Sequence, residues 1–165
     1  MLAIKPHHFV DILCSLGDGI ERFTPHPYGH AVHSVARRLL DAPNTVLRIE
    51  LQADDICAPC CHNIDGQCDD TIDTSFRPSA PESKREWNLR IDQRWCKVLG
   101  IAQDEKIVAI ELCRKIQKQL DQLPAIYREI IEPQRIAQRR SRLDAGIRRY
   151  LGSKETDSSS SHKGS

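Results

Sequence analysis

The sequence predicts a mainly helical α+β fold, a single small domain of about five helices with one short strand and a cysteine-rich metal loop. Three observations support this class. Apolar residues recur at helical spacing through most of the chain. Residues 45–52 instead alternate between apolar and polar side chains, as a half-buried strand does. Residues 53–81 are rich in Asp, Pro and Cys and poor in large apolar residues, which is typical of a loop held by a bound metal rather than by a core.

Two helices are predicted before the strand. Residues 5–16 begin with Lys-Pro, and proline suits the first turn of a helix. Apolar residues then recur at every third or fourth position until Gly17. Residues 32–40 repeat this pattern and end before a proline. The strand at 45–52 then leads directly into the cysteine-rich loop.

A capping box marks the start of the next helix. Ser83 and Glu86 have the separation at which a hydroxyl and a carboxylate satisfy the first backbone N–H groups of a helix. Trp87, Ile91 and Trp95 follow at helical spacing on one face. We therefore expect the domain to pack around these three side chains.

Two further helical segments follow. Gly100 is predicted to end the tryptophan helix, and Asp104 to cap the next one, whose apolar stripe extends over 107–123. The last helix is expected to run to about Leu151, with an interruption at Pro133.

The length of the chain sets its domain organisation. At 165 residues there is room for one core, so we expect residues 1–151 to form a single globular domain. Residues 152–165 are rich in serine and have little to bury, which predicts a disordered tail.

The charge is balanced, with 24 Lys and Arg against 23 Asp and Glu. Nucleic acid is therefore an unexpected partner, and the arginines of the last helix, without interleaved aromatic residues, are typical of a solvated face. Charged N-terminal residues do not fit a secretory signal, and no apolar run approaches the roughly 18 residues of a membrane-spanning helix. We expect a cytoplasmic protein with no membrane partner; the oligomeric state stays open.

Cys57, Cys60 and Cys68 are the strongest candidates for metal or cofactor ligands. A two-residue spacer lets two thiolates reach one centre, as in zinc knuckles and iron-sulfur loops. The Asp-Gly turn at 65–66 is placed to fold Cys68 back toward the other two. Seven cysteines in a reducing compartment favour metal or redox chemistry over disulfides. Cys96 and Cys113, on amphipathic helices, are expected to be buried apolar residues instead.

The fourth ligand is left open by the sequence. Zinc and iron-sulfur sites normally need four, and the candidates are Cys14, Cys61, a histidine (either His7 or His8) and a non-protein ligand. Cys61 adjoins Cys60, so the two side chains point in different directions.

Three N-terminal residues are candidates for catalysis. Asp11 lies one helical turn from both His7 and His8 and is placed to orient an imidazole for ligation or proton transfer. His30 and His33, spaced for one helix face but without a third ligand nearby in sequence, are expected to be solvated.

The acidic pair at 54–55 precedes the first cysteine of the loop. Two interpretations have similar weight. The carboxylates cap a turn through hydrogen bonds to backbone N–H groups, or their negative charge disfavours free thiolates until a cation binds.

Lys-Pro-His-His at 5–8 and Asp-Asp-Ile-Cys at 54–57, followed by Cys60 and Cys68, are short motifs that are unusual in combination. Over residues 1–100 this arrangement resembles an uncharacterised family of bacterial and archaeal proteins described as iron-sulfur-binding. The resemblance implies cluster ligation by the three cysteines of the loop. It implies no substrate.

The chain departs from that family near its start. The family usually reads His-His-Leu-Leu-Cys, whereas here Asp11 stands three positions after His8 and a cysteine follows at Cys14. Cys14 lies one helical turn farther on, so it either reaches a similar place from the same helix face or the fourth ligand is lost.

The leading hypothesis is a protein with an iron-sulfur cluster, of the four-iron type, that serves electron transfer, redox sensing or docking to a redox protein partner. One alternative is a structural zinc knuckle in a binding module. Another is a small metalloenzyme in which His7, His8 or Asp11 handles protons.

Overall fold

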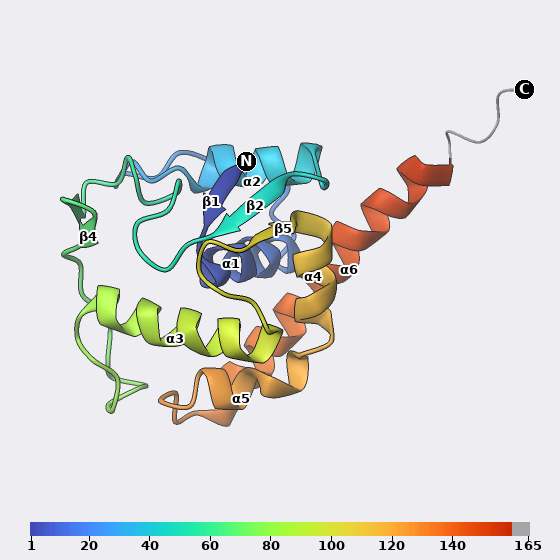
Figure 1. Ribbon diagram of the computed structural model, residues 1–165. Coiled ribbons are helices and arrows are strands. Elements are labelled where there is room, and N and C mark those ends of the chain that lie inside the picture. The colour runs from blue at the N-terminus through green and yellow to red at the C-terminus, as the bar shows by residue number, and fades with distance from the viewer. Residues whose placement is uncertain (160–165) are drawn as a thin grey trace, which may run out of the picture.

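Six α-helices and a small three-stranded sheet make up most of residues 1–159, the part of the chain that the computed structural model describes (Figure 1). The first half contains β1 (Leu2–Ile4), α1 (Pro6–Gly17), α2 (Val32–Asp41), β2 (Val46–Ile49), β3 (Asn63–Ile64) and β4 (Gln67–Cys68). The second contains α3 (Lys84–Leu99), β5 (Lys106–Val108), α4 (Ala109–Gln117), a 3-10 helix (Leu120–Gln122), α5 (Leu123–Ile126) and α6 (Pro133–Ser159). The predicted mainly helical α+β class is confirmed.

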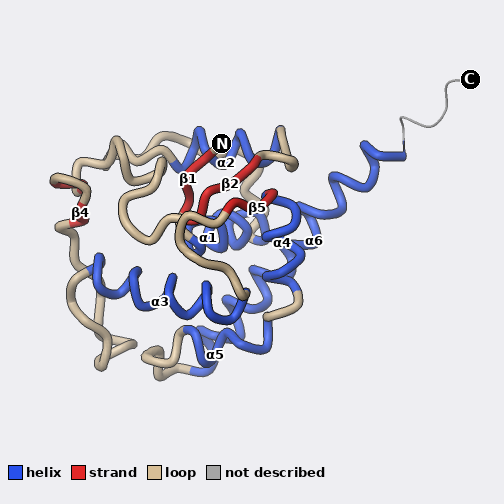
Figure 2. The backbone as a smooth tube through the Cα atoms, in the orientation of Figure 1, coloured by secondary structure: helices blue, strands red, loops and turns tan. Residues whose placement is uncertain are grey.

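The sheet has the order β1-β2-β5, with β1 parallel and β5 antiparallel to the central strand (Figure 2). The predicted strand is confirmed as β2, and β1 and β5 are additional. Each of these two has three residues, too few for an alternating pattern to be recognised. The pairing of Ile4 with Ile49 places the end of β1, and hence the start of α1, beside the entry to the cysteine-rich loop.

Helix α3 forms as its sequence predicts. The Ser83 hydroxyl accepts a hydrogen bond from the Glu86 backbone N–H, and Gly100 ends the helix in the left-handed conformation. Trp87, Ile91 and Trp95 are all buried, so the predicted core face is confirmed. The cysteine-rich loop leads into this helix, and β4 lies beside its start (Figure 1).

The closest helix contact joins α1 to α6. A methyl group at Gly17 would overlap the backbone of Arg142, and one at Gly146 would overlap the backbone carbonyl of Leu13. The two backbones therefore approach closely because both contact positions are glycine. This contact holds α1, which carries both candidate histidines, against the C-terminal helix.

The segment around Asp104 differs from its prediction. Asp104 does not cap a helix; it has a left-handed backbone (φ 65°) in a turn that leads into β5, and its carboxylate accepts from Arg48 (2.7 Å). Pairing with β2 makes residues 106–108 a strand, and α4 begins after Val108 without a side-chain cap. The interruption predicted at Pro133 coincides with the start of α6.

The C-terminal helix extends beyond its predicted end. Backbone helix continues to Ser159, past Gly152, where the sequence predicts the tail to begin. The rest of that predicted tail, 160–165, lies outside the described residues. None of the helices within the described residues combines the length and the apolar character needed to cross a lipid bilayer.

Candidate metal centre

Asp54 ties the cysteine-rich loop to the N-terminus. One carboxylate oxygen accepts from the backbone N–H groups of Ile56 (3.1 Å) and Cys57 (2.9 Å), and the other accepts from the Lys5 N–H (2.8 Å). Asp55 accepts from the Ala3 N–H at 2.9 Å. The turn-capping interpretation is thus confirmed for Asp54, whereas Asp55 holds strand β1. The contacts place Cys57 beside the start of α1, and Lys5 Nζ lies 3.5 Å from its Sγ.

Both candidate histidines are held by buried carboxylates. Nδ1 of His8 lies 2.7 Å from Asp54, and Nδ1 of His7 lies 2.7 Å from Asp92 on α3. The two imidazole rings are 4.2 Å apart. With Nδ1 engaged, Nε2 is the remaining ring nitrogen of His8 for a metal, an arrangement common among histidine ligands.

The orienting role predicted for Asp11 is wrong. Asp11 pairs instead with Arg139 of α6 at 3.3 Å and is about half exposed. Asp54 and Asp92 orient the imidazoles in its place, because chain packing brings them to the Nδ1 atoms from 46 and 85 residues away.

The electrostatics differ between the two imidazoles. Burial and the neighbouring His7 lower the pKa of His8, which favours its neutral, metal-binding form. Burial opposes charging of His7 as well, but attraction to Asp92 raises the pKa of His7 above its usual value. Burial and the charge of Asp54 raise the pKa of Cys57 to about 11. The free thiol of Cys57 is therefore protonated near neutral pH.

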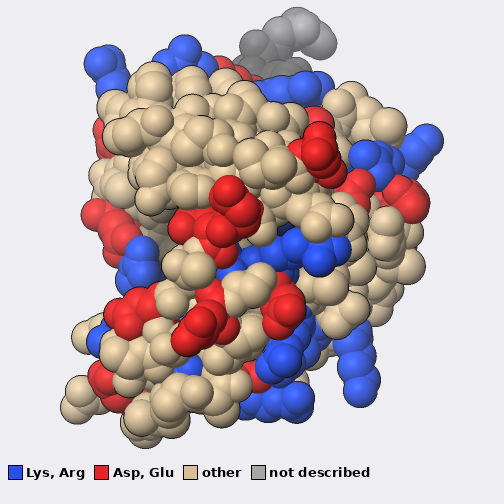
Figure 3. All heavy atoms as spheres, turned by 90° about the vertical axis from the view of Figure 1, so that its left-hand side faces the viewer, with Lys and Arg blue, Asp and Glu red and all other residues tan. Residues whose placement is uncertain are grey.

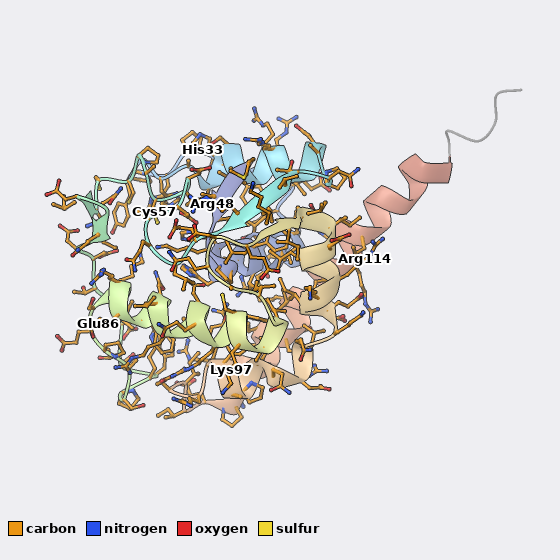
Figure 4. All side chains as sticks on the ribbon, viewed as in Figure 1. His33, Arg48, Cys57, Glu86, Lys97 and Arg114 are labelled. Atoms are coloured by element: carbon orange, nitrogen blue, oxygen red, sulfur yellow. The ribbon has the colours of Figure 1, made fainter. Side chains whose placement is uncertain are left out.

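The three predicted cysteine ligands line one cavity of about 280 Å³. Its wall also includes His7, His8, His30, His62, Lys5, Lys84 and Asp70. Figure 4 shows Cys57 on the loop that follows β2. Figure 3 shows the face of the molecule that lies on the left-hand side of Figure 1. On this face Lys and Arg atoms occupy a recess, and Asp and Glu atoms surround it.

One group within the described residues brings three ligand atoms within 4.8 Å of one another: His8, Asp54 and Cys57. Asp54 already accepts four hydrogen bonds, two on each oxygen. His8 and Cys57 are therefore the metal ligands that this group offers, and Asp54 positions both.

The hairpin formed by β3 and β4 carries the third cysteine. Asp65 and Gly66 both have positive φ, as a tight turn requires, and Cys68 pairs with Asn63 across the hairpin. The turn predicted at 65–66 is thereby confirmed. It returns Cys68 to the cavity shared by Cys57 and Cys60.

The other cysteines lie elsewhere. Cys96 and Cys113 are buried, as predicted, and burial raises the pKa of Cys113 to about 12. Cys14 is 2% exposed in the core and is not among the residues lining the cavity. Cys61 is exposed and also lies outside the cavity lining.

Several site residues were not identified from the sequence. His62, whose Nδ1 lies 2.7 Å from Asp69, lines the cavity, and its position next to Cys61 was a usable signal. Asp92 stands in the apolar stripe of α3, a position that indicates a buried carboxylate with a partner. His30, predicted to be solvated, precedes α2, stacks on His26 and also lines the cavity, whereas His33 does not.

Comparisons of this chain with protein-family models, with curated proteins and with solved structures find no match.

Proposed function

We propose that this protein binds an iron-sulfur cluster of the four-iron type and uses it to exchange electrons with a redox protein partner. Cys57, Cys60 and Cys68 provide three ligands, and His8 provides the fourth. The observation that carries this proposal is that all four side chains line one cavity. Three thiolates with one imidazole are a donor set that suits iron as well as zinc.

Two of the three cysteines lie outside the closest group of ligand atoms, which suits a cluster better than a single zinc ion. Thiolates bound to one tetrahedral zinc, at about 2.3 Å from the ion, lie roughly 3.8 Å apart. In a four-iron cluster each thiolate binds a separate iron, so the sulfurs surround a larger volume. Cys60 and Cys68 share the cavity with Cys57 but lie outside the close group formed by His8, Asp54 and Cys57.

The surroundings suit a redox centre. Lys5 places positive charge on the cavity wall, 3.5 Å from the Cys57 sulfur, which offsets the negative charge of a thiolate-bound cluster, whereas Lys84 is paired with Asp70 of the same wall. Cys57, Cys60 and Cys68 are half-buried, so a partner protein can approach the centre closely.

Purification under anaerobic conditions tests the cluster. We expect brown protein with visible absorption, iron and acid-labile sulfide. Cys60→Ser should abolish the absorption, whereas Cys61→Ser, a matched control at the adjacent exposed position, should retain it. Colourless wild-type protein with stoichiometric zinc would contradict the proposal and support the zinc alternative.

The fourth ligand has its own test. His8→Ala should keep most of the iron but change the reduction potential and the electron paramagnetic resonance spectrum, because three thiolates still hold the cluster. Cys14→Ser should leave both properties unchanged, since Cys14 lies outside the cavity lining. A spectrum altered by Cys14→Ser and unaltered by His8→Ala would assign the fourth ligand to Cys14 instead.

A further inference from the structure

A second cavity, of about 370 Å³, adjoins the candidate metal centre. The two cavities share His7, Asp11, Lys84 and Asn88. The second is lined by α1, the N-terminal part of α3 and the loop before it, the segment after α5, and α6. It contains none of the cysteines, so its chemistry differs from that of the metal centre.

Positive charge dominates the walls of this second cavity. Its described lining includes five cations, Arg77, Lys84, Arg135, Arg139 and Arg142, and one acidic residue, Asp11. Three of the cations pair with carboxylates outside the lining: Lys84 with Asp70, Arg135 with Glu132 and Arg142 with Asp18. Arg139 pairs with Asp11 within the lining. Ion pairs therefore compensate four of the five cations, and Arg77 carries the charge that is left.

Arg77 is the least compensated of these cations. No carboxylate within the described residues forms an ion pair with it, and its Nε donates to the backbone carbonyl of Asp73 at 2.8 Å. Burial lowers the pKa of Arg77; attraction to the Asp73 carboxylate offsets part of this effect, and the charges of Arg139 and Arg135 add to it. An anion placed among these guanidinium groups would relieve their mutual repulsion.

Aromatic rings hold three of the guanidinium groups in place. Arg77 lies over Phe76 and Trp87, at 4.7 and 4.8 Å from the ring centroids. Arg135 lies over Phe76 at 4.0 Å, and Arg139 lies over Tyr127 at 4.5 Å. A stacked guanidinium loses little further freedom when its N–H edge binds an oxyanion. The same rings, with Ile91, provide an apolar wall.

We propose that this second cavity binds a small organic anion whose phosphate or carboxylate group pairs with Arg77, Arg135 and Arg139, while its apolar part contacts the aromatic wall. A guanidinium group binds phosphate and carboxylate alike through two parallel N–H···O hydrogen bonds. The geometry therefore identifies an oxyanion as the ligand group, common to both. This site goes beyond the proposed function and does not depend on which metal the neighbouring centre holds.

Titration calorimetry of the full chain as purified, at low salt, tests the site with three probes. Phenyl phosphate and benzoate represent the two oxyanions, and benzyl alcohol is the neutral control. We expect at least one anion to bind, to bind more weakly at higher salt, and to bind more tightly than the alcohol. The tighter of the two anions identifies the headgroup. If neither anion binds, or the alcohol binds equally well, the proposal is wrong.

Arginine variants locate the binding. Arg77→Gln should weaken the better anion about tenfold or more, the loss expected for a charged hydrogen-bonding group. Arg135→Gln, which leaves only the exposed Glu132 unpaired, is a second variant should Arg77→Gln fail to fold. The matched control is Arg140→Gln, since Arg140 is also on α6 and pairs with an exposed carboxylate, Asp121, but lies outside the cavity lining. Equal losses in the cavity variants and in Arg140→Gln would overturn the assignment.

Discussion

Replacement of Gly146 by alanine is expected to destabilise the protein by about 3 kcal/mol, the upper part of the range for overpacking a close contact. The added methyl group would overlap the Leu13 carbonyl, which is backbone and cannot rotate away. Helices α1 and α6 would have to separate, which disturbs the largest interhelical contact of the fold. Urea denaturation followed by circular dichroism measures the loss.

The same helix provides a control for this substitution. Gly152 has no neighbouring atom within 4 Å of an added methyl group, and it is exposed. Gly152→Ala should therefore leave stability unchanged or raise it slightly, because alanine favours helix more than glycine does. Equal free energies of unfolding for Gly146→Ala and Gly152→Ala would show that the α1–α6 contact accommodates the methyl group without destabilisation.

Removal of the Asp54 carboxylate should both destabilise the fold and disrupt the candidate metal centre. Asp54→Ala leaves the buried N–H groups of Lys5, Ile56 and Cys57 without their acceptor, so we expect a loss of at least about 3 kcal/mol. It also frees His8 from its fixed orientation. Chemical denaturation gives the stability, and iron content after reconstitution gives the effect on the centre.

An exposed carboxylate in the same loop provides the control. Its removal deletes a negative charge, as Asp54→Ala does, but leaves no buried N–H group without an acceptor. Asp69 is 56% exposed and holds Nδ1 of His62, as Asp54 holds that of His8. Asp69→Ala should change the free energy of unfolding by less than about 1 kcal/mol, because water replaces its contact. A similar decrease in the free energy of unfolding in both variants would contradict the role of Asp54 as the buried acceptor that holds the loop.

Local signals account for the elements that were predicted correctly. In α3, the Ser83 cap, the regular spacing of Trp87, Ile91 and Trp95, and the terminal Gly100 all lie within one segment. The turn at 65–66 is equally local, since positive φ is readily adopted by Asp and Gly. The spacing of Cys57, Cys60 and Cys68 likewise identified three residues of the cavity wall.

Other features depend on segments that are distant in the chain. Residues 106–108 form a strand because β2 offers a free edge, and Asp104 enters the turn before it rather than capping a helix. Asp11 lies one helical turn from both histidines, yet its side chain is drawn to Arg139 of α6. Sequence spacing shows which side chains of one helix are close enough to interact. It does not show that a residue of another helix, here Arg139, will bind one of them instead.

The sequence by itself determined α1, α2 and α3, the central strand, the core face of α3 and the cysteine loop, because periodicity, caps and turns act over a few residues. Only the tertiary structure decided that Asp92 and Asp54 orient His7 and His8, that His62 joins the cavity, and that the arginines of α6 meet Arg77. The physical reason is that a carboxylate, an imidazole or a guanidinium takes whichever partner packing brings within hydrogen-bonding distance, and chain separation does not enter that choice.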